Sequence, residues 1–548
     1  MSSGTTGARG LAGSAALMFS GTLVSRVLGL LRNILLVAAI GLTGAANSFA
    51  VANRLPNVVY MLVAGGVLNA ILVPQIVRAM KSRDGGDEYV NRLLTMAGAA
   101  LLTLTVLLTA GASVLVAIYA SGLEQVWFDL AVAFALWCVP QLFFYGMYTL
   151  LGQVLNAKGI FGPFMWAPAA NNLVALIGLV ACSLLFGTAT ATGVNPDPAA
   201  WSRLRTAVIG GSATLGVVVQ AVILIIPLRR SGFRYRPRWG LRGSGLGRAG
   251  KVATWAFASL LVAQVGFIAI SNLAAAASRA ATDGFVAGNA AWDSANFLYM
   301  LPQSLITVSL VTALFTRVSH YAATGQGAAV RDDLSLGLRT IAVFTVFAGG
   351  ALAVVALPLV QAILPTATFP EAQGTAAVVV ALLGGIAALG AFTMIQRVYY
   401  AYEDTKWLFR LQVPLTLIVI VGCLVSTLLP PQWWLVGAAV ATTASNIVGS
   451  VVAYLALRRK LPSLDGGRVL RTHIRVVLAA TPPLLAGWGL LHLIGPVARA
   501  DSTVAQMFEA LVKVAVPGLV MLVGYIPLLK VLRVGEPEVI ARPVLAMV

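Results

Sequence analysis

Two arginines, Arg26 and Arg32, lie inside the first long apolar stretch of the chain, which runs from Leu17 to Gly41. An arginine at the centre of a membrane-spanning helix costs about 2.5 to 3.5 kcal/mol on insertion scales, so it needs water, an anion or a partner. A guanidinium group matches phosphate oxygens with two parallel hydrogen bonds and stays charged. The two arginines therefore predict a binding site for a phosphate-bearing group.

Helical spacing separates these two arginines. Asn33 lies seven residues after Arg26 and shares its helical face, whereas Arg32 falls about 120° away around the helix. Gly29 lies between the arginines and is a position where the helix could bend. We expect Arg26 to face the site, and the contribution of Arg32 to depend on a bend at Gly29.

The next apolar stretch adds a third positive charge. Asn47 and Arg54 are seven residues apart, Asn53 precedes Arg54, and Pro56 interrupts the helical hydrogen bonds shortly afterwards. Three fixed positive charges beside polar side chains favour binding of a polyanionic head group. The alternative for Arg32 and Arg54 is a side chain that extends to the membrane surface and binds nothing.

A second polar set is predicted in the second half of the chain. Asp293 is the one acidic residue of its apolar stretch, and Asn296 lies on a similar face. Asp293 could pair with Arg26 across a cavity, carry a coupling cation or proton, or simply contact water at the membrane surface. We expect gating or interlobe contacts from a charged group near residue 400: Arg397, Glu403 and Asp404.

Composition identifies the class of protein that must position these residues. The 548 residues are 59% hydrophobic and 10% charged, with a mean hydropathy of +0.90, which indicates a membrane-embedded chain. No removable signal peptide is expected at the start. Apolar stretches of about 20 residues predict an all-α polytopic protein with fourteen spans: 15–41, 48–77, 93–120, 126–156, 164–187, 204–228, 252–277, 288–316, 338–364, 374–402, 407–428, 432–457, 473–495 and 504–531.

The distribution of positive charge predicts the orientation. When both termini are placed in the cytoplasm, the 37 lysines and arginines fall mostly on the cytoplasmic side. The exceptions are four external residues (Arg203, Arg205, Arg279, Arg499) and four within spans (Arg26, Arg32, Arg54, Lys513). The net charge of +19 then reflects membrane topology and attraction to anionic lipids, and we expect no nucleic-acid partner.

Catalytic and metal-binding sites are not predicted. Cys138, Cys182 and Cys423 fall inside apolar spans without paired spacing, so we expect packing roles. The three histidines are scattered, which provides neither a zinc site nor a catalytic set, and no cofactor is expected. Glu509 and Lys513 are predicted to form an i, i+4 ion pair in the last span.

A weak internal repeat predicts two lobes. Residues 52–56 resemble residues 295–302, and residues 151–157 resemble residues 395–401, at a nearly constant offset. Two six-helix lobes in parallel orientation around a central cavity are a transporter architecture. We therefore expect an N-lobe at 1–228, a basic cytoplasmic linker at 229–251, a C-lobe at 252–457, a cytoplasmic loop at 458–472, and two additional helices with a short tail at 473–548.

Several motifs in order resemble the MurJ (MviN) lipid II flippases over essentially the whole chain. They are Ser25-Arg-Val-Leu-Gly-Leu-Leu-Arg32, Asn47-Ser-Phe-Ala-Val-Ala-Asn-Arg-Leu-Pro-Asn57, Ala70-Ile-Leu-Val-Pro-Gln-Ile76, Leu151 to Ala157, Ala167-Pro-Ala-Ala-Asn-Asn172 and Tyr400-Ala-Tyr-Glu-Asp-Thr-Lys406. The resemblance implies the multidrug/oligosaccharidyl-lipid/polysaccharide exporter fold, a bacterial cytoplasmic-membrane location, and outward flipping of the undecaprenyl-diphosphate-linked peptidoglycan precursor for cell-wall synthesis. It leaves open a partnership with the cell-wall synthesis machinery.

The resemblance also implies roles for individual residues. Arg26 and Arg32 match two cavity arginines thought to bind the diphosphate, Arg54 matches a basic position, and the last two helices would hold the polyprenyl tail. The chain departs from the family pattern at three places, where many relatives carry an aspartate or arginines: Asn47, Tyr60-Met61 and Phe297. With fewer positively charged residues than many relatives carry, this chain would depend more on the arginines of the first helix to bind the diphosphate.

Other functions remain open at this stage. An exporter of a different polyprenyl-linked saccharide would share the same features. A drug/cation antiporter of the same fold predicts acids in the first-lobe cavity, which the first two spans lack. A membrane enzyme such as a glycan polymerase needs a large external loop with catalytic acids, whereas the longest predicted external segment holds only Asp197.

Overall fold

The computed structural model is helical throughout its described part, without strands, as the composition predicts. It describes residues 4–63, 87–158, 160, 162–188, 201–240, 247–280, 285–461, 463–497 and 503–535. Within these ranges eleven helices are long and apolar enough to span a membrane, and one bent pair at 44° makes twelve. These twelve correspond to twelve of the predicted spans. The helices at the other two predicted spans, 15–41 and 48–77, are not among them, so the total of fourteen spans remains a prediction.

The chain divides into two compact units, Met1–Leu261 and Val262–Val548. Helix α11 (Gly247–Ala280) crosses this boundary as one continuous helix. The lobe and linker boundaries predicted from the sequence therefore stay predictions. Residues 64–77, the motif 70–76, part of the predicted linker (241–246) and Arg499 lie outside the described residues.

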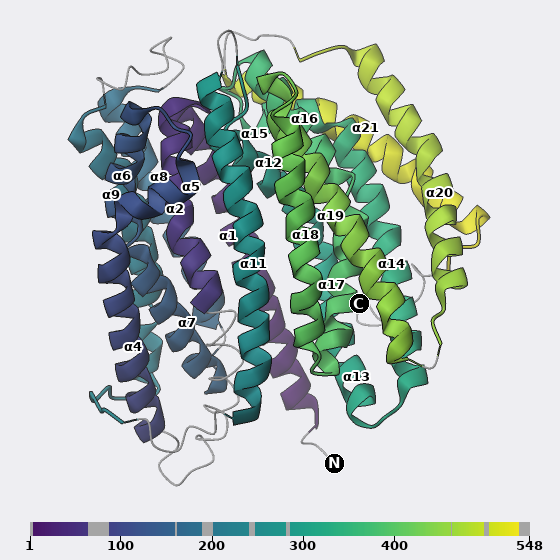
Figure 1. Ribbon diagram of the computed structural model, residues 1–548, viewed down its shortest axis with the longest axis horizontal. Helices are drawn as coiled ribbons and strands as arrows, with labels where there is room; N and C mark the ends of the chain where they lie inside the picture. Colours follow the sequence, from purple (N-terminus) through teal and green to yellow (C-terminus); the bar gives the residue numbers. More distant parts are fainter. Residues whose placement is uncertain are drawn as a thin grey trace. The chain divides into compact units, whose positions relative to one another are not determined.

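The first unit is a bundle of helices in which several spans consist of two consecutive helices (Figure 1). Its other helices are α1 (Gly4–Ile40), α2 (Gly44–Val63), α4 (Asp87–Ala110), α5 (Ala112–Ala120), α6 (Gln125–Cys138), α7 (Gln141–Ala157), α8 (Gly162–Phe186), α9 (Arg203–Val222) and α10 (Ile225–Arg230). Helix α1 packs on α8, α8 on α9, α2 on α6 and α4 on α7. The break between α6 and α7 coincides with Pro140, which cannot donate a backbone hydrogen bond.

Small residues bring α8 and α9 close together. A Cβ atom added to Gly216 would lie 2.7 Å from the carbonyl oxygen of Asn171, and one added to Gly178 would lie 2.1 Å from the side chain of Ser212. Between helices in lipid, such close approach supplies the van der Waals packing that the hydrophobic effect cannot. The α8–α9 pair therefore forms a rigid platform for the polar side chains on α8.

The second unit contains the remaining helices. They are α12 (Asn289–Pro302), the π-helix η3 (Gln303–Thr307), α13 (Val308–Ala323), α14 (Gly327–Val354), α15 (Ala356–Ile363), α16 (Phe369–Leu383), α17 (Ile386–Ala401), α18 (Thr405–Ser426), the short η4 (Pro431–Trp433), α19 (Trp434–Ala456), η5 (Leu457–Arg459), α20 (Gly466–Ile494) and α21 (Thr503–Val531). A capping box starts α16, where the backbone N–H of Thr368 donates to Glu371 at 2.7 Å.

The last two helices pack on α14 and α15, with α20 beside α14 and α21 beside α15 (Figure 1). The rings of Phe347 and Tyr525 stack at 4.3 Å, and the Tyr525 hydroxyl donates to the carbonyl oxygen of Val343 at 2.7 Å. Lys513 Nζ lies 2.6 Å from Glu509 Oε1, which confirms the predicted i, i+4 ion pair. The same Nζ donates to the carbonyl oxygen of Pro496 at 2.5 Å.

The distribution of apolar side chains fits a membrane environment. Leu184, Leu428 and Leu493 are more than 80% exposed, and many similar side chains cover the outer helix faces. A water-soluble protein rarely exposes such contiguous apolar surface, because exposure forfeits the hydrophobic stabilisation. All three cysteines are buried and unbridged, which confirms their predicted packing role.

Candidate functional site

Arg32 is held against α8 by an asparagine that also binds α1. The guanidinium of Arg32 donates to Asn172 Oδ1 at 3.5 Å. The Nδ2 of the same amide donates to the carbonyl oxygen of Ser25 at 2.8 Å and to its hydroxyl at 3.3 Å. One amide thus joins α8 to two positions on α1, seven residues apart. Because an amide is neutral, this bond does not neutralise the positive charge of Arg32.

Gly29 lies against the same Asn172 side chain. A Cβ atom placed there would lie 3.5 Å from the Nδ2 of Asn172, and α1 is a single helix from Gly4 to Ile40. The glycine therefore packs against the asparagine within an unbroken helix. The contact with Asn172 accounts for the position of the Arg32 guanidinium without any break in α1 at Gly29.

Side chains from α2 and α7 extend this polar region. The Tyr145 hydroxyl interacts with the Asn57 side chain and lies within the electrostatic field of Arg32. Its ring is 5.6 Å from that of Tyr60, whose hydroxyl is hydrogen bonded to Thr149. Two bonded groups, Ser25–Arg32–Asn172 and Asn57–Tyr60–Tyr145–Thr149, are linked by the electrostatic effect of Arg32 on Tyr145. We call these seven residues together the first-unit polar seam.

The other predicted residues of α1 lie close by along the helix. Arg26 is partly buried and follows Ser25 directly, one turn or more before Arg32. Asn33 is also partly buried, and its Nδ2 is enclosed without a hydrogen-bond partner in the described ranges. A buried amide donor of this kind is available to an acceptor such as a phosphate oxygen.

The predicted residues of α2 occupy three different environments. Asn53 accepts from Gln141 of α7 at 3.4 Å, and Gln141 also donates to Thr214 of α9. Arg54 is partly buried, and its charge acts electrostatically on the hydroxyl of Tyr119, at the end of α5. Asn47 is 2% exposed, so it lies inside the packed first unit.

Arg205 is buried within the first unit. The sequence predicts that it lies at the external side of the membrane, and the structure shows its side chain to be only 7% exposed. Its guanidinium donates to the carbonyl oxygen of Ala39 at 3.0 Å and lies 4.5 Å from the ring of Trp201. The last carbonyls of a helix have no partner within it, so Arg205 caps α1.

In the second unit, Asp293 and Asn296 are partly buried on α12, next to the partly buried Phe297. Hydrogen bonds hold both ends of this helix. Asn289 donates to the carbonyl of Ser271 at 3.0 Å, and Asn446 donates to the Tyr299 hydroxyl at 3.2 Å. The helix that carries the predicted second-lobe polar pair is therefore fixed within its own unit.

The π-helix η3 continues α12 directly after Pro302. Gln303 donates to the Thr393 hydroxyl of α17 at 3.0 Å, but Gln303 Oε1 and Thr307 Oγ1 are buried without a partner in the described part of the chain. Both atoms face Gly390, where an added Cβ would lie 3.7 and 3.3 Å from them. π-Helical turns are frequent at functional sites, and this one was not foreseen from the sequence.

The three predicted gating residues lie in different local environments. The guanidinium of Arg397 lies 5.4 Å from the ring of Phe315, a cation–π contact with α13. Asp404 caps α18 by accepting from the backbone of Trp407 at 3.3 Å, and it pairs with Lys460 at 2.8 Å. Glu403 is exposed, with a φ of 55°. Their role in gating remains a prediction.

Metal binding finds no support within the described ranges, where no group of three His, Cys, Asp or Glu side chains comes together. The first-unit polar seam offers a fixed cation, hydroxyls and amides. Such a set can bind an anionic oxygen-rich group by charge-assisted hydrogen bonds.

Curated relatives match over most of the chain. The protein is 24% identical to a probable lipid II flippase MurJ of Haemophilus influenzae, covering 88% of this chain and 92% of the relative. It is 27% identical to a lipid II flippase MurJ of Burkholderia cenocepacia, covering 86% and 87%.

Solved structures share the fold. A lipid II flippase MurJ in an inward closed conformation matches with a TM-score of 0.68 at 18% identity, covering 94% of this chain and 99% of that one. An inward-facing multidrug resistance MATE transporter of the MOP superfamily matches with a TM-score of 0.62 at 14% identity, covering 81% and 98%. The model of the family "Lipid II flippase MurJ" matches residues 36–498. The chain therefore belongs to the lipid II flippase MurJ family, a family of transporters.

Proposed function

We propose that this protein moves lipid II, the undecaprenyl-diphosphate-linked peptidoglycan precursor, from the inner to the outer leaflet by alternating access. The observation that carries this proposal is the family match, which covers residues 36–498. Curated relatives with the same printed function cover 80% or more of the chain. The transported head group supplies material for cell-wall synthesis on the outer side.

The diphosphate would bind at the arginines of the first unit. Arg32 has a neutral amide as its hydrogen-bond partner, so its charge stays available to an anion. Arg26 and Arg54 would add two further cations from α1 and α2, and the buried Nδ2 of Asn33 would add a donor. Charge-assisted hydrogen bonds to phosphate are about twice as strong as neutral ones, which favours this set over a site for a neutral sugar.

Other predicted residues would assist transport without holding the diphosphate. Asn47 and Asn53 would position α2, since one is buried and the other is bonded to α7. Asp293 and Asn296 would form the polar surface that the second lobe presents to the substrate. We propose that Arg397, Glu403 and Asp404 act where the lobes separate, with Asp404 fixed by its cap and ion pair.

The membrane topology follows from charge. We propose a location in the bacterial cytoplasmic membrane with both termini in the cytoplasm, because lysines and arginines concentrate on that side of the predicted spans. Anionic lipids and the cell-wall synthesis machinery are the proposed partners.

Depletion of the protein tests the proposal in cells that have no second flippase. Lipid II should accumulate in the inner leaflet, where an external labelling reagent does not reach it, while its total amount rises. A normal rate of lipid II appearance at the outer surface would refute the function. A drug/cation antiporter would instead leave lipid II unaffected and increase sensitivity to cationic drugs on depletion.

A further inference from the structure

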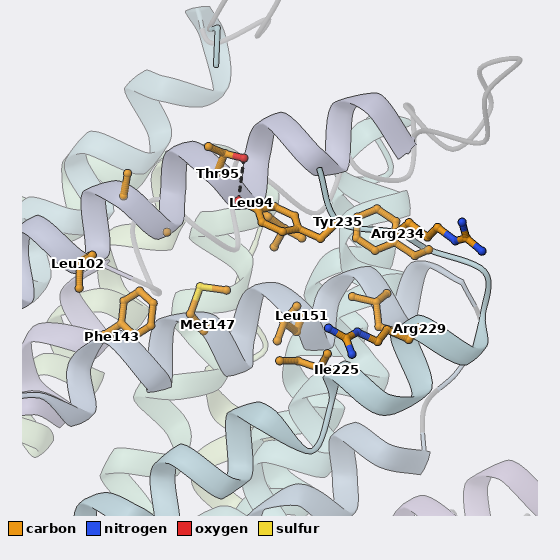
Figure 2. A pocket seen from close by; sticks show the side chains of 14 residues that line it. Leu94, Thr95, Leu102, Phe143, Met147, Leu151, Ile225, Arg229, Arg234 and Tyr235 are labelled. Carbon is orange, nitrogen blue, oxygen red and sulfur yellow. Dashed lines mark hydrogen bonds between the residues drawn. The ribbon is translucent and has the colours of Figure 1, made fainter. Parts of the chain in front are cut away.

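A cavity of about 770 Å³ lies in the first unit between α4, α7, α10 and the segment that follows α10 (Figure 2). Figure 2 shows Leu102 and Phe143 at one end of the row of lining side chains, Met147 in the middle, and Arg229 and Arg234 at the other end. No acidic residue is among the 14 residues that line it. The cavity is thus apolar along most of its length and cationic at one end.

The segment after α10 is fixed on α4, which keeps the cationic end in place. The Tyr235 hydroxyl is 2.9 Å from the Thr95 hydroxyl. The backbone N–H of Arg236 donates to Asn91 Oδ1 at 2.7 Å. Arg234 directly precedes these two anchored residues, so its backbone is held at the rim. The sequence predicts a basic linker at 229–251, and the structure shows that Tyr235 and Arg236 of this segment are bonded to helix α4.

The cavity runs from the end of α4 into its apolar middle. Helix α4 begins with Asp87 and Glu88, whereas the lining residues Leu94 and Leu102 lie further along it. The rise between Leu94 and Leu102 is about 12 Å at 1.5 Å per residue. Leu102 is 52% exposed, so the deep end borders the surface that faces lipid. A ligand with an anionic head and an apolar chain fits this arrangement.

We propose that the cavity binds an anionic phospholipid. The phosphate would contact Arg229 and Arg234, and one acyl chain would lie between α4 and α7, against Phe143 and Met147. Basic pockets between membrane helices on the cytoplasmic side are suited to such head groups, and arginine binds phosphate with two hydrogen bonds. The apolar end gives a small soluble anion nothing to bind, so the lining favours a lipid.

This site is separate from the first-unit polar seam. Its lining comes from α4, α7, α10 and the following segment. Helix α7 contributes to both sites, but none of the seven seam residues lines the cavity. A phospholipid bound here would brace the basic segment against α4 from one leaflet. The lipid acts as a structural ligand, and its binding can be measured without transport.

Native mass spectrometry of the purified full chain in a neutral detergent tests the proposal. The probe is an equimolar mixture of phosphatidylglycerol and phosphatidylcholine, and the measured quantity is the occupancy of each lipid. The double substitution Arg229→Gln/Arg234→Gln should weaken phosphatidylglycerol binding about 30-fold, or about 2 kcal/mol at 1.4 kcal/mol per tenfold. Arg230→Gln is the matched control, because Arg230 is exposed on α10 and does not line the cavity.

A second pair of variants tests the apolar end. A Cβ at Gly98 would lie 3.7 Å from Met147 Sδ, so Gly98→Ala fits, whereas Gly98→Leu would fill the space of the acyl chain. Gly98→Leu should abolish binding of phosphatidylglycerol with an unchanged melting temperature, and Gly98→Ala should retain it. The proposal would be overturned if the protein bound both phospholipids equally. Wild-type binding of phosphatidylglycerol by the double arginine variant, or by Gly98→Leu, would also overturn it. So would displacement of phosphatidylglycerol by equimolar undecaprenyl diphosphate.

Discussion

Replacing Asn172 by alanine removes the amide that joins α8 to α1 beside Arg32. The substitution deletes donor bonds of 2.8 and 3.3 Å to Ser25 and an acceptor bond of 3.5 Å from Arg32. Polar contacts between membrane helices average about 0.6 kcal/mol. The short bond to the Ser25 carbonyl should contribute most, so we expect the free energy of unfolding to fall by about 1 to 2 kcal/mol.

A double-mutant cycle isolates the part that belongs to Arg32. Residues in direct contact show coupling energies of about 0.5 kcal/mol or more, and the 3.5 Å distance between Arg32 and Asn172 places this pair at the lower end. Unfolding of wild type, Arg32→Gln, Asn172→Ala and the double variant in detergent micelles measures the coupling. The same four proteins are then compared for lipid II transport.

Asn171→Ala is the matched control on the same helix. Asn171 donates to Gln220 of α9 at 2.7 Å, so its loss should cost similar stability without coupling to Arg32. A coupling near zero between Arg32 and Asn172, or an equal coupling for Asn171, would refute the assignment of Asn172 as the residue that positions Arg32.

Two further predictions concern charged residues with structural partners. Arg205→Leu leaves the buried carbonyl of Ala39 unpaired, so unfolding should require about 1 to 3 kcal/mol less, measured as a lower melting temperature. The exposed control Arg203→Gln should change it by less than about 0.5 kcal/mol, and equal effects would contradict the capping role. Asp404→Asn loses only the ion pair with Lys460 and should cost less than about 1 kcal/mol in the same assay. Asp404→Ala also loses the helix cap and should cost about 1 kcal/mol more, so equal costs for the two variants would exclude the cap as a contributor.

The all-helical membrane fold follows from the sequence because lipid offers backbone groups no hydrogen-bond partners. Long apolar stretches must then form helices, and their positions can be counted directly. The Glu509–Lys513 pair was predictable for the same reason, since helical geometry alone brings residues four apart together. Local rules of this kind need no knowledge of which helices are neighbours.

Contacts between helices could not be predicted from such local rules. Asn172 is one of several polar residues within spans, and its contacts with Ser25 and Arg32 depend on α8 packing against α1. Charge counting placed Arg205 on the external side of the membrane, but it says nothing about whether the side chain is buried. Its burial depends on the carbonyl of Ala39, which is distant in the sequence, and on the nearby ring of Trp201. Trp201, four residues before Arg205, was the available signal.

The central claim is that the protein moves a polyprenyl diphosphate by means of its first-helix arginines. This claim is tested with proteoliposomes that contain fluorescent lipid II. The measured quantity is the fraction of dye that an external quencher reaches, followed over time with and without a membrane potential. We predict that the wild-type protein translocates lipid II faster than protein-free vesicles do. Arg26→Ala should slow it about 10- to 100-fold, the equivalent of one charge-assisted hydrogen bond, and Arg26→Lys should retain part of the rate. No acceleration by the wild type, or a wild-type rate in Arg26→Ala, would contradict the account.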